Sequence, residues 1–85
     1  MPILTPRQTQ ILQLTANGFC YAEIALMLGV SHQTVKNHLY DIGVRLNTSG
    51  RIESIFYAIA VDLIDFELAR DCIKRRVDAR LEARI

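Results

Sequence analysis

The chain has 85 residues, enough for one compact domain with a modest core and too few for a second folded domain. Hydrophobic residues make up 51% and charged residues 22% of the sequence, which is ordinary for a globular protein and excludes extensive disorder. The formal net charge is +1, so a polyanionic partner such as DNA would have to be held by a few well-placed cations.

The first predicted helix runs from about Pro6 to Ala16. Thr5 is a good N-cap, proline is favoured at the first helical position, and Gln8 stands three residues after the cap, as in a capping box. Asn17 and Gly18 both tolerate left-handed backbone, so we expect them to end this helix.

A second, short helix is predicted over residues 23–28, and a third follows Ser31 and reaches about Leu46. Gly29 stops the second helix, and Ser31 is a good N-cap for the third. Apolar residues spaced by three or four positions predict the buried face of the third helix: Val35, Leu39, Ile42 and Leu46. The opposite face carries polar side chains long enough to reach a partner: Gln33, Lys36, Asn37 and Tyr40.

From Arg51 onward the sequence contains neither proline nor glycine. Apolar residues recur in steps of three and four, interrupted by Arg70, and predict one long helix that ends near Arg84. The residues of this stripe are Ile52, Phe56, Ile59, Leu63, Phe66, Ile73 and Val77. Its distal part has no partner within a monomer, so we expect a homodimer formed through the stripe. The alternative is a break near Asp65, after which the tail folds back onto its own domain.

Two helices joined by a tight turn around Gly29, with amide and cationic side chains on the free face of the second, are typical of a helix-turn-helix. The sequence therefore predicts an all-α fold. Residues 1–64 are expected to form a DNA-binding domain, and residues 65–85 a C-terminal helical extension that serves dimerisation.

The segment from Leu4 to Asn47 resembles the LuxR/GerE family of bacterial transcription-factor DNA-binding domains. The markers are Leu4-Thr5-Pro6-Arg7, Gly18, Glu23-Ile24-Ala25, Leu28-Gly29-Val30-Ser31, Thr34-Val35-Lys36 with His38, and Leu46, and the similarity continues to about Ile64. The resemblance implies a four-helix domain that binds the major groove through its third helix and often dimerises through its fourth. Family members often have Ser-Asn-Lys where this chain has Cys20-Tyr21-Ala22, so a capping hydroxyl and a phosphate-binding cation are missing here.

Seven side chains form the predicted DNA-binding set: Gln33, Thr34, Lys36, Asn37, His38, Tyr40 and Arg45. The resemblance implies that Lys36, Asn37 and Tyr40 contact base edges or nearby phosphates. Thr34, His38 and Arg45 match positions that usually contact the DNA backbone. Lysine can donate to guanine and asparagine can pair with adenine, whereas Asp41 would repel phosphate.

Without the resemblance, the same residues have other readings. The face that carries Lys36 and Asn37 could simply be solvated. Tyr40 could cover part of the core instead of meeting DNA. His38 could be a buried, hydrogen-bonding histidine.

No spacing of chemically reactive residues points to an enzyme. Cys20 and Cys72 lie far apart, and neither they nor the histidines form a metal-ligand or nucleophile–base pattern. We therefore expect no cofactor and no metal. The start of the chain lacks a secretion signal and no apolar run is long enough to cross a bilayer, so we expect a cytoplasmic protein without a membrane partner.

The favoured interpretation is a stand-alone transcriptional regulator that binds an inverted-repeat site on double-stranded DNA as a homodimer. Two alternatives stay open. Similar helix-turn-helix units occur in sigma-factor region four and in phage terminase small subunits, so docking on DNA could serve recruitment of RNA polymerase or genome packaging. The unit could also be a protein-interaction module that has lost DNA binding, as the low net charge would permit.

Overall fold

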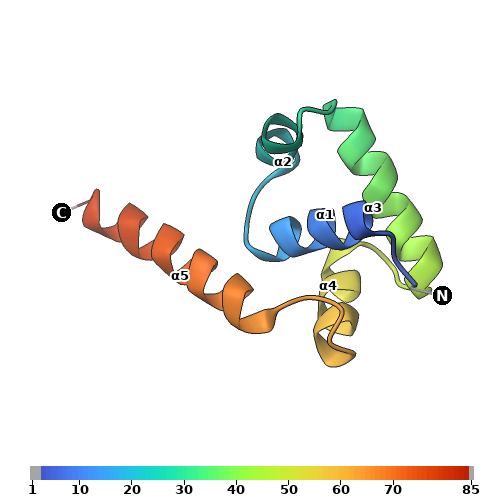
Figure 1. The fold of residues 1–85 in the computed structure, drawn as a ribbon. Helices are drawn as coiled ribbons and strands as arrows, with labels where there is room; N and C mark the ends of the chain where they lie inside the picture. Colours follow the sequence, from blue (N-terminus) through green and yellow to red (C-terminus); the bar gives the residue numbers. More distant parts are fainter. Residues whose placement is uncertain (1–2, 85) are drawn as a thin grey trace.

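A computed structural model describes residues 3–84 as a chain of helices without a β-strand (Figure 1). The helices are α1 (Pro6–Ala16), α2 (Tyr21–Leu28), α3 (His32–Leu46), α4 (Arg51–Ala60) and α5 (Phe66–Glu82). The predicted all-α class is thus confirmed, and the first three helices lie within two residues of their predicted bounds. Within the same residues, no helix has the length and apolar character that a bilayer crossing requires.

The predicted signals at the start of α1 and at the end of α2 are confirmed. The Thr5 hydroxyl accepts the backbone N–H of Gln8 at 3.1 Å, and the Gln8 side chain accepts the N–H of Thr5 at 3.1 Å. Gly29 ends α2 with a φ of +67°, a conformation that costs glycine little. Asn17 and Gly18 end α1 as predicted, but Asn17 does so with a right-handed φ of −72°, and of the two only Gly18, at +96°, is left-handed.

Helix α2 begins at Tyr21, two residues earlier than predicted. The reason is that the side chain of Glu23 caps the start of the helix. The carboxylate of Glu23 accepts the backbone N–H of Cys20 at 2.9 Å. This bond satisfies one of the amide groups that the first turn of a helix leaves without a partner.

Two clusters of buried side chains meet on the inner face of α3. Val35 packs with residues of α1 and α2 in one cluster: Ile11, Ile24 and Ala25. Ile42 and Leu46 pack in the other cluster with Leu4, Leu12, Ala16, Ala58, Ile64 and Ala69. Leu39 packs against both clusters. The apolar face of α3 therefore packs against α1, α2 and α4, and the opposite face is turned outward.

The expected single helix from Arg51 to Arg84 is wrong, and the chain breaks between α4 and α5, as the alternative anticipated. Asp62 is left-handed, with a φ of +59°, and the N–H of Leu63 donates to the carbonyl of Ala58 at 2.8 Å. Asp65 then caps α5 by accepting the N–H of Leu68 at 3.0 Å. The physical reason is burial, because the turn lets Leu63 and Ile64 pack against the core.

Helix α5 rests on the domain along much of its length, and its C-terminal end extends away from it (Figure 1). Gln13 of α1 accepts the backbone N–H of Asp65 at 2.6 Å and donates to its carbonyl at 3.0 Å. Ala69 is buried in the second core cluster. The projecting end gives the molecule its longest dimension, 48 Å against 29 and 20 Å.

The break divides the apolar stripe that the sequence suggested. Ile59 and Leu63 are half-buried and pack against the core of their own domain. The remaining five residues of the stripe are exposed: Ile52, Phe56, Phe66, Ile73 and Val77. The exposed stripe is therefore shorter than the sequence suggested, and it is carried by two helices instead of one.

Candidate nucleic-acid interface

The outward face of α3 carries the polar side chains that the sequence singled out. Gln33, Lys36, Asn37 and Tyr40 are exposed, and Tyr40 retains 78% of its accessible surface. The Gln33 amide donates to Asn37 Oδ1 at 2.9 Å, which aligns the two side chains one turn apart. The spacing of three and four residues places all four side chains on one stripe of the helix.

The two half-buried members of the predicted set are Thr34 and His38. Thr34 lies in the first turn of α3, where its backbone N–H donates to the Ser31 hydroxyl at 3.0 Å. The two hydroxyl groups of Ser31 and Thr34 are 2.8 Å apart. Both hydroxyls thus stand at the amino end of α3, where the helix dipole favours an anion.

Arg45 and Asp41 form a bridge between α3 and the start of the chain. The Arg45 Nε donates to Asp41 Oδ2 at 2.9 Å, and Arg45 Nη1 donates to the carbonyl of Ile3 at 3.3 Å. The amide of Gln8 donates to the same oxygen of Asp41. Asp41 was expected to repel phosphate, but its carboxylate accepts hydrogen bonds from both Gln8 and Arg45. The same contacts occupy part of the Arg45 guanidinium inside the protein.

These donors lower the pKa of Asp41 below its ordinary value, the Gln8 amide first and the Arg45 guanidinium second. A carboxylate with a depressed pKa stabilises the folded state above its unfolded pKa, and that stability is lost as the pH falls through the folded pKa. Asp41→Asn should therefore lower the melting temperature by a few degrees near neutral pH. The difference from wild type should shrink below about pH 4, the ordinary range for aspartate.

Thermal melts followed by circular dichroism from pH 7 to pH 2.5 would measure this difference. Asp62→Asn is the matched control, because asparagine tolerates the left-handed backbone at this exposed position and the same charge is removed. A melting difference for Asp41→Asn that stays constant down to the lowest pH would contradict the role assigned to the carboxylate.

The structure also brings together residues that sequence reasoning left apart. The Arg51 guanidinium of α4 lies 5.3 Å from the ring centre of Tyr21 in α2, and the His32 ring of α3 lies 5.6 Å from the same ring. These contacts join the first turns of three helices. No local sequence pattern predicts them, because His32 and Arg51 are 11 and 30 positions from Tyr21.

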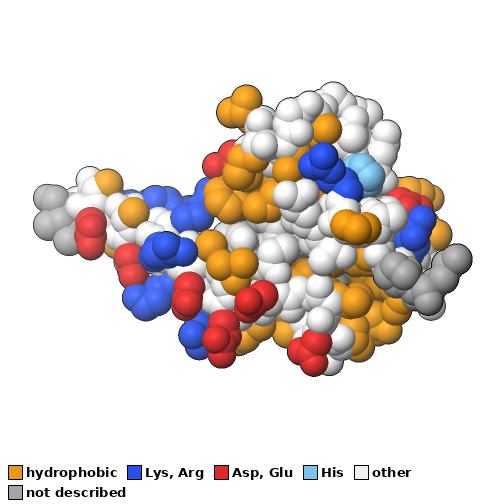
Figure 2. Space-filling model, viewed as in Figure 1, with side chains coloured by type: hydrophobic (Ala, Val, Ile, Leu, Met, Phe, Trp, Pro, Cys, Tyr) orange, Lys and Arg blue, Asp and Glu red, His pale blue; other side chains and the backbone are white. Residues whose placement is uncertain are grey.

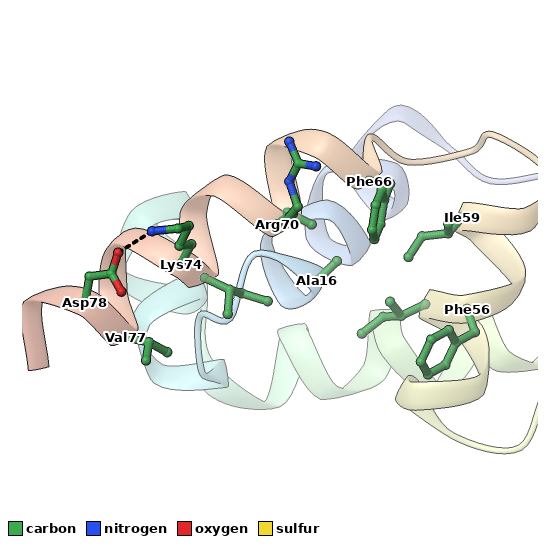
Figure 3. A pocket seen from close by; sticks show the side chains of 11 residues that line it. Ala16, Phe56, Ile59, Phe66, Arg70, Lys74, Val77 and Asp78 are labelled. Atoms are coloured by element: carbon green, nitrogen blue, oxygen red, sulfur yellow. Dashed lines mark hydrogen bonds and ion pairs between the residues drawn. The ribbon is translucent and has the colours of Figure 1, made fainter. Parts of the chain in front are cut away.

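An apolar groove of about 580 Å³ lies between α4 and α5 (Figure 3). Ile59 of α4 and Phe66 of α5 point toward one another across it, and the ion pair between Lys74 and Asp78, 2.6 Å long, lies at its rim (Figure 3). The guanidinium of Arg70 points away from the groove, so the interruption in the sequence stripe leaves the lining apolar.

Taken together, α2, the turn at Gly29 and an outward-facing α3 define a helix-turn-helix unit, the class of domain that places its second helix against DNA. The model of the luxR family of bacterial regulatory proteins matches residues 2–58. The chain therefore belongs to this family, whose members are DNA-binding regulators and not enzymes.

Individual relatives agree with this assignment. The chain is 35% identical over 63 residues to the quorum sensing-dependent transcriptional regulator VjbR of Brucella ovis, a match that covers 74% of this chain and 24% of VjbR. It is 41% identical over 64 residues to the oxygen regulatory protein NreC of Staphylococcus carnosus, covering 75% of this chain and 30% of NreC. The matched part thus spans less than a third of either relative.

A solved structure of the transcription factor GerE has the same fold. It superposes with a TM-score of 0.75 at 27% sequence identity, over 78% of this chain and 98% of the GerE chain. The four-helix family fold is thereby confirmed for most of the chain.

Proposed function

We propose that the chain binds double-stranded DNA sequence-specifically, with α3 in the major groove, as the DNA-binding module of a transcriptional regulator. The observation that carries this proposal is the exposure of Lys36, Asn37 and Tyr40 on one face of a helix whose opposite face is buried. Lys36 would donate to guanine, and Asn37 would pair with adenine. Both contacts require that the exposed face of α3 lie in the major groove.

The remaining members of the site are assigned to positioning on the DNA backbone. Thr34 and His38 lie on the flanks of the stripe, and Gln33 can add a contact beside Asn37 through its amide. Arg45 can reach phosphate only by sharing its guanidinium with Asp41 and the carbonyl of Ile3.

We further propose that two copies join through the groove between α4 and α5, with residues 65–85 as the extension that completes the interface. Five exposed apolar side chains line or flank this surface, and a second copy is the partner that would cover them. In a two-fold interface each surface meets itself. A rim that carries both Lys74 and Asp78 can pair with its own copy, which favours self-association over a partner of one charge.

The experiment that tests the DNA proposal is selection from a random pool of double-stranded DNA, followed by a salt titration on the enriched sequence. We expect an inverted repeat with half-sites about one helical turn apart. The affinity should fall steeply with salt, because cationic side chains that bind phosphates displace counterions condensed on the DNA, and added salt opposes this release. A pool that shows no enrichment, or binding insensitive to salt, would contradict the proposal and favour the protein-interaction alternative.

A further inference from the structure

Arg76 of α5 contacts Glu23 in the first turn of α2 and Phe19 just before that helix. Its Nη2 lies 3.3 and 3.4 Å from the two carboxylate oxygens of Glu23, and its guanidinium lies 4.5 Å from the ring centre of Phe19. Nη1 is buried and has no hydrogen-bond partner among the described residues. The guanidinium is thus pinned between an acidic group and an aromatic ring instead of extending into solvent.

Arg76 differs in this respect from the rest of α5. It is half-buried, whereas the other basic residues of the helix are exposed: Arg70, Lys74, Arg75 and Arg80. The approach of the helix is close at this point, because a Cβ added to Gly18 would lie 3.3 Å from Ile73 of α5. Acidic and basic side chains otherwise alternate along the surface of α5 (Figure 2).

Glu23 is one of the family markers, but the lysine that often precedes it in the family is replaced here by Ala22. Glu23 caps α2 by accepting the N–H of Cys20, and this bond first, then Arg76, holds the pKa of its carboxyl below the usual value. The carboxylate is therefore charged at neutral pH. In a helix-turn-helix the first helix crosses the DNA backbone, so a bare carboxylate in its first turn would face phosphates. Residues 20–22 contain no cation to offset this charge.

We propose that Arg76 is a positioning residue for DNA binding, which acts from α5 by cancelling the charge of Glu23 and holding the first turn of α2. This inference rests on the proposed DNA-binding function. It makes α5 part of the DNA-binding unit as well as of the dimer surface. It also explains how a chain without a cation in residues 20–22 can bring α2 to the DNA backbone.

The test compares full-length variants by fluorescence anisotropy on the DNA selected with wild-type protein. Arg76→Ala should raise Kd roughly three- to tenfold at low salt, the scale of one uncompensated charge near phosphates. Arg80→Ala is the matched control, because it removes the same kind of side chain from an exposed position of α5 outside the rim formed by Lys74 and Asp78. We expect it to change Kd less than about twofold.

Glu23→Gln separates charge cancellation from a purely structural role. Glutamine keeps an oxygen that can accept the Cys20 N–H, but it removes the charge. In the Arg76→Ala background it should restore binding to within about twofold of wild type. As a single substitution it should tighten binding and steepen the salt dependence by about one phosphate contact, because Arg76 is then unbalanced. This single variant needs no change at Arg76 and so does not depend on how that variant folds.

Equal Kd values for Arg76→Ala and Arg80→Ala would overturn the inference. It would also be overturned if Glu23→Gln neither restored binding in the double variant nor tightened it alone. If wild-type protein selects no DNA, the proposed function itself fails, and the inference fails with it. If wild type binds DNA but Arg76→Ala and the control variant have equal Kd values, the inference fails and the proposed function stands.

Discussion

Replacing Lys36 with alanine should weaken binding to the selected DNA by about 1–3 kcal/mol, a rise of roughly 5- to 150-fold in Kd. The same range applies to Asn37→Ala. Both side chains are exposed on α3, and neither belongs to the buried clusters that hold the helix. The domain should therefore stay folded, with a free energy of unfolding changed by less than about 0.5 kcal/mol.

Anisotropy titrations on the selected site and on single-base variants would measure both effects. Lys36→Ala should relax discrimination at one guanine, and Asn37→Ala at one adenine, because each contact is specific to a base edge. Arg80→Ala again serves as the control for a lost positive charge. Titrations that are unchanged in both variants would remove α3 from the interface, since its two best-placed base readers would then be dispensable.

A Phe56→Glu variant should be monomeric at concentrations where the wild type is dimeric. Phe56 retains 68% of its accessible surface on α4 and lines the groove shared with α5. Removing an aromatic residue from the centre of an interface typically costs 2 kcal/mol or more, so the dimer Kd should rise by at least about 30-fold. The buried carboxylate would add a desolvation penalty.

Light scattering at tens of micromolar would measure the association state. Leu26→Glu is the matched control, because Leu26 is an exposed leucine on α2, 84% accessible, away from α4 and α5. It should leave the dimer intact. A wild-type protein that is monomeric throughout this range would contradict the proposed interface, as would a Phe56→Glu variant that still dimerises.

Loss of the dimer should also change DNA binding in a recognisable way. A monomer has one recognition helix, so Phe56→Glu should bind an isolated half-site as well as wild type does, yet lose the preference for the inverted repeat. If wild type and variant showed the same relative affinity for the half-site and for the inverted repeat, dimerisation would have no role in DNA recognition.

The start of α1, the end of α2 and the outward face of α3 could all be predicted from the sequence. Thr5 with Gln8, Gly29 and Ser31 act on backbone groups within four residues, so their effect is written in the adjacent sequence. The polar stripe on α3 follows from the helical repeat alone. Exposure of Lys36, Asn37 and Tyr40 was predictable for the same reason.

The break between α4 and α5 was harder, because two local tendencies compete there. The apolar repeat favours a continuous helix, while Asp62 and Asp65 favour a turn and a cap. Only the core decides the outcome, since ending the helix lets Ile64 become buried and Leu63 pack against the core. The local sequence pattern was compatible with both a continuous helix and a break, and it could not decide between them.

The sequence by itself thus determined the first three helices to within two residues and the polar side of α3, because these depend on neighbours a few residues away. Tertiary structure decided how the charges are used. Asp41 meets Gln8 across 33 residues, and Arg76 meets Glu23 across 53. Contacts at such separations depend on how whole helices pack, so a residue that looks unfavourable in its own segment can be neutralised by a distant one.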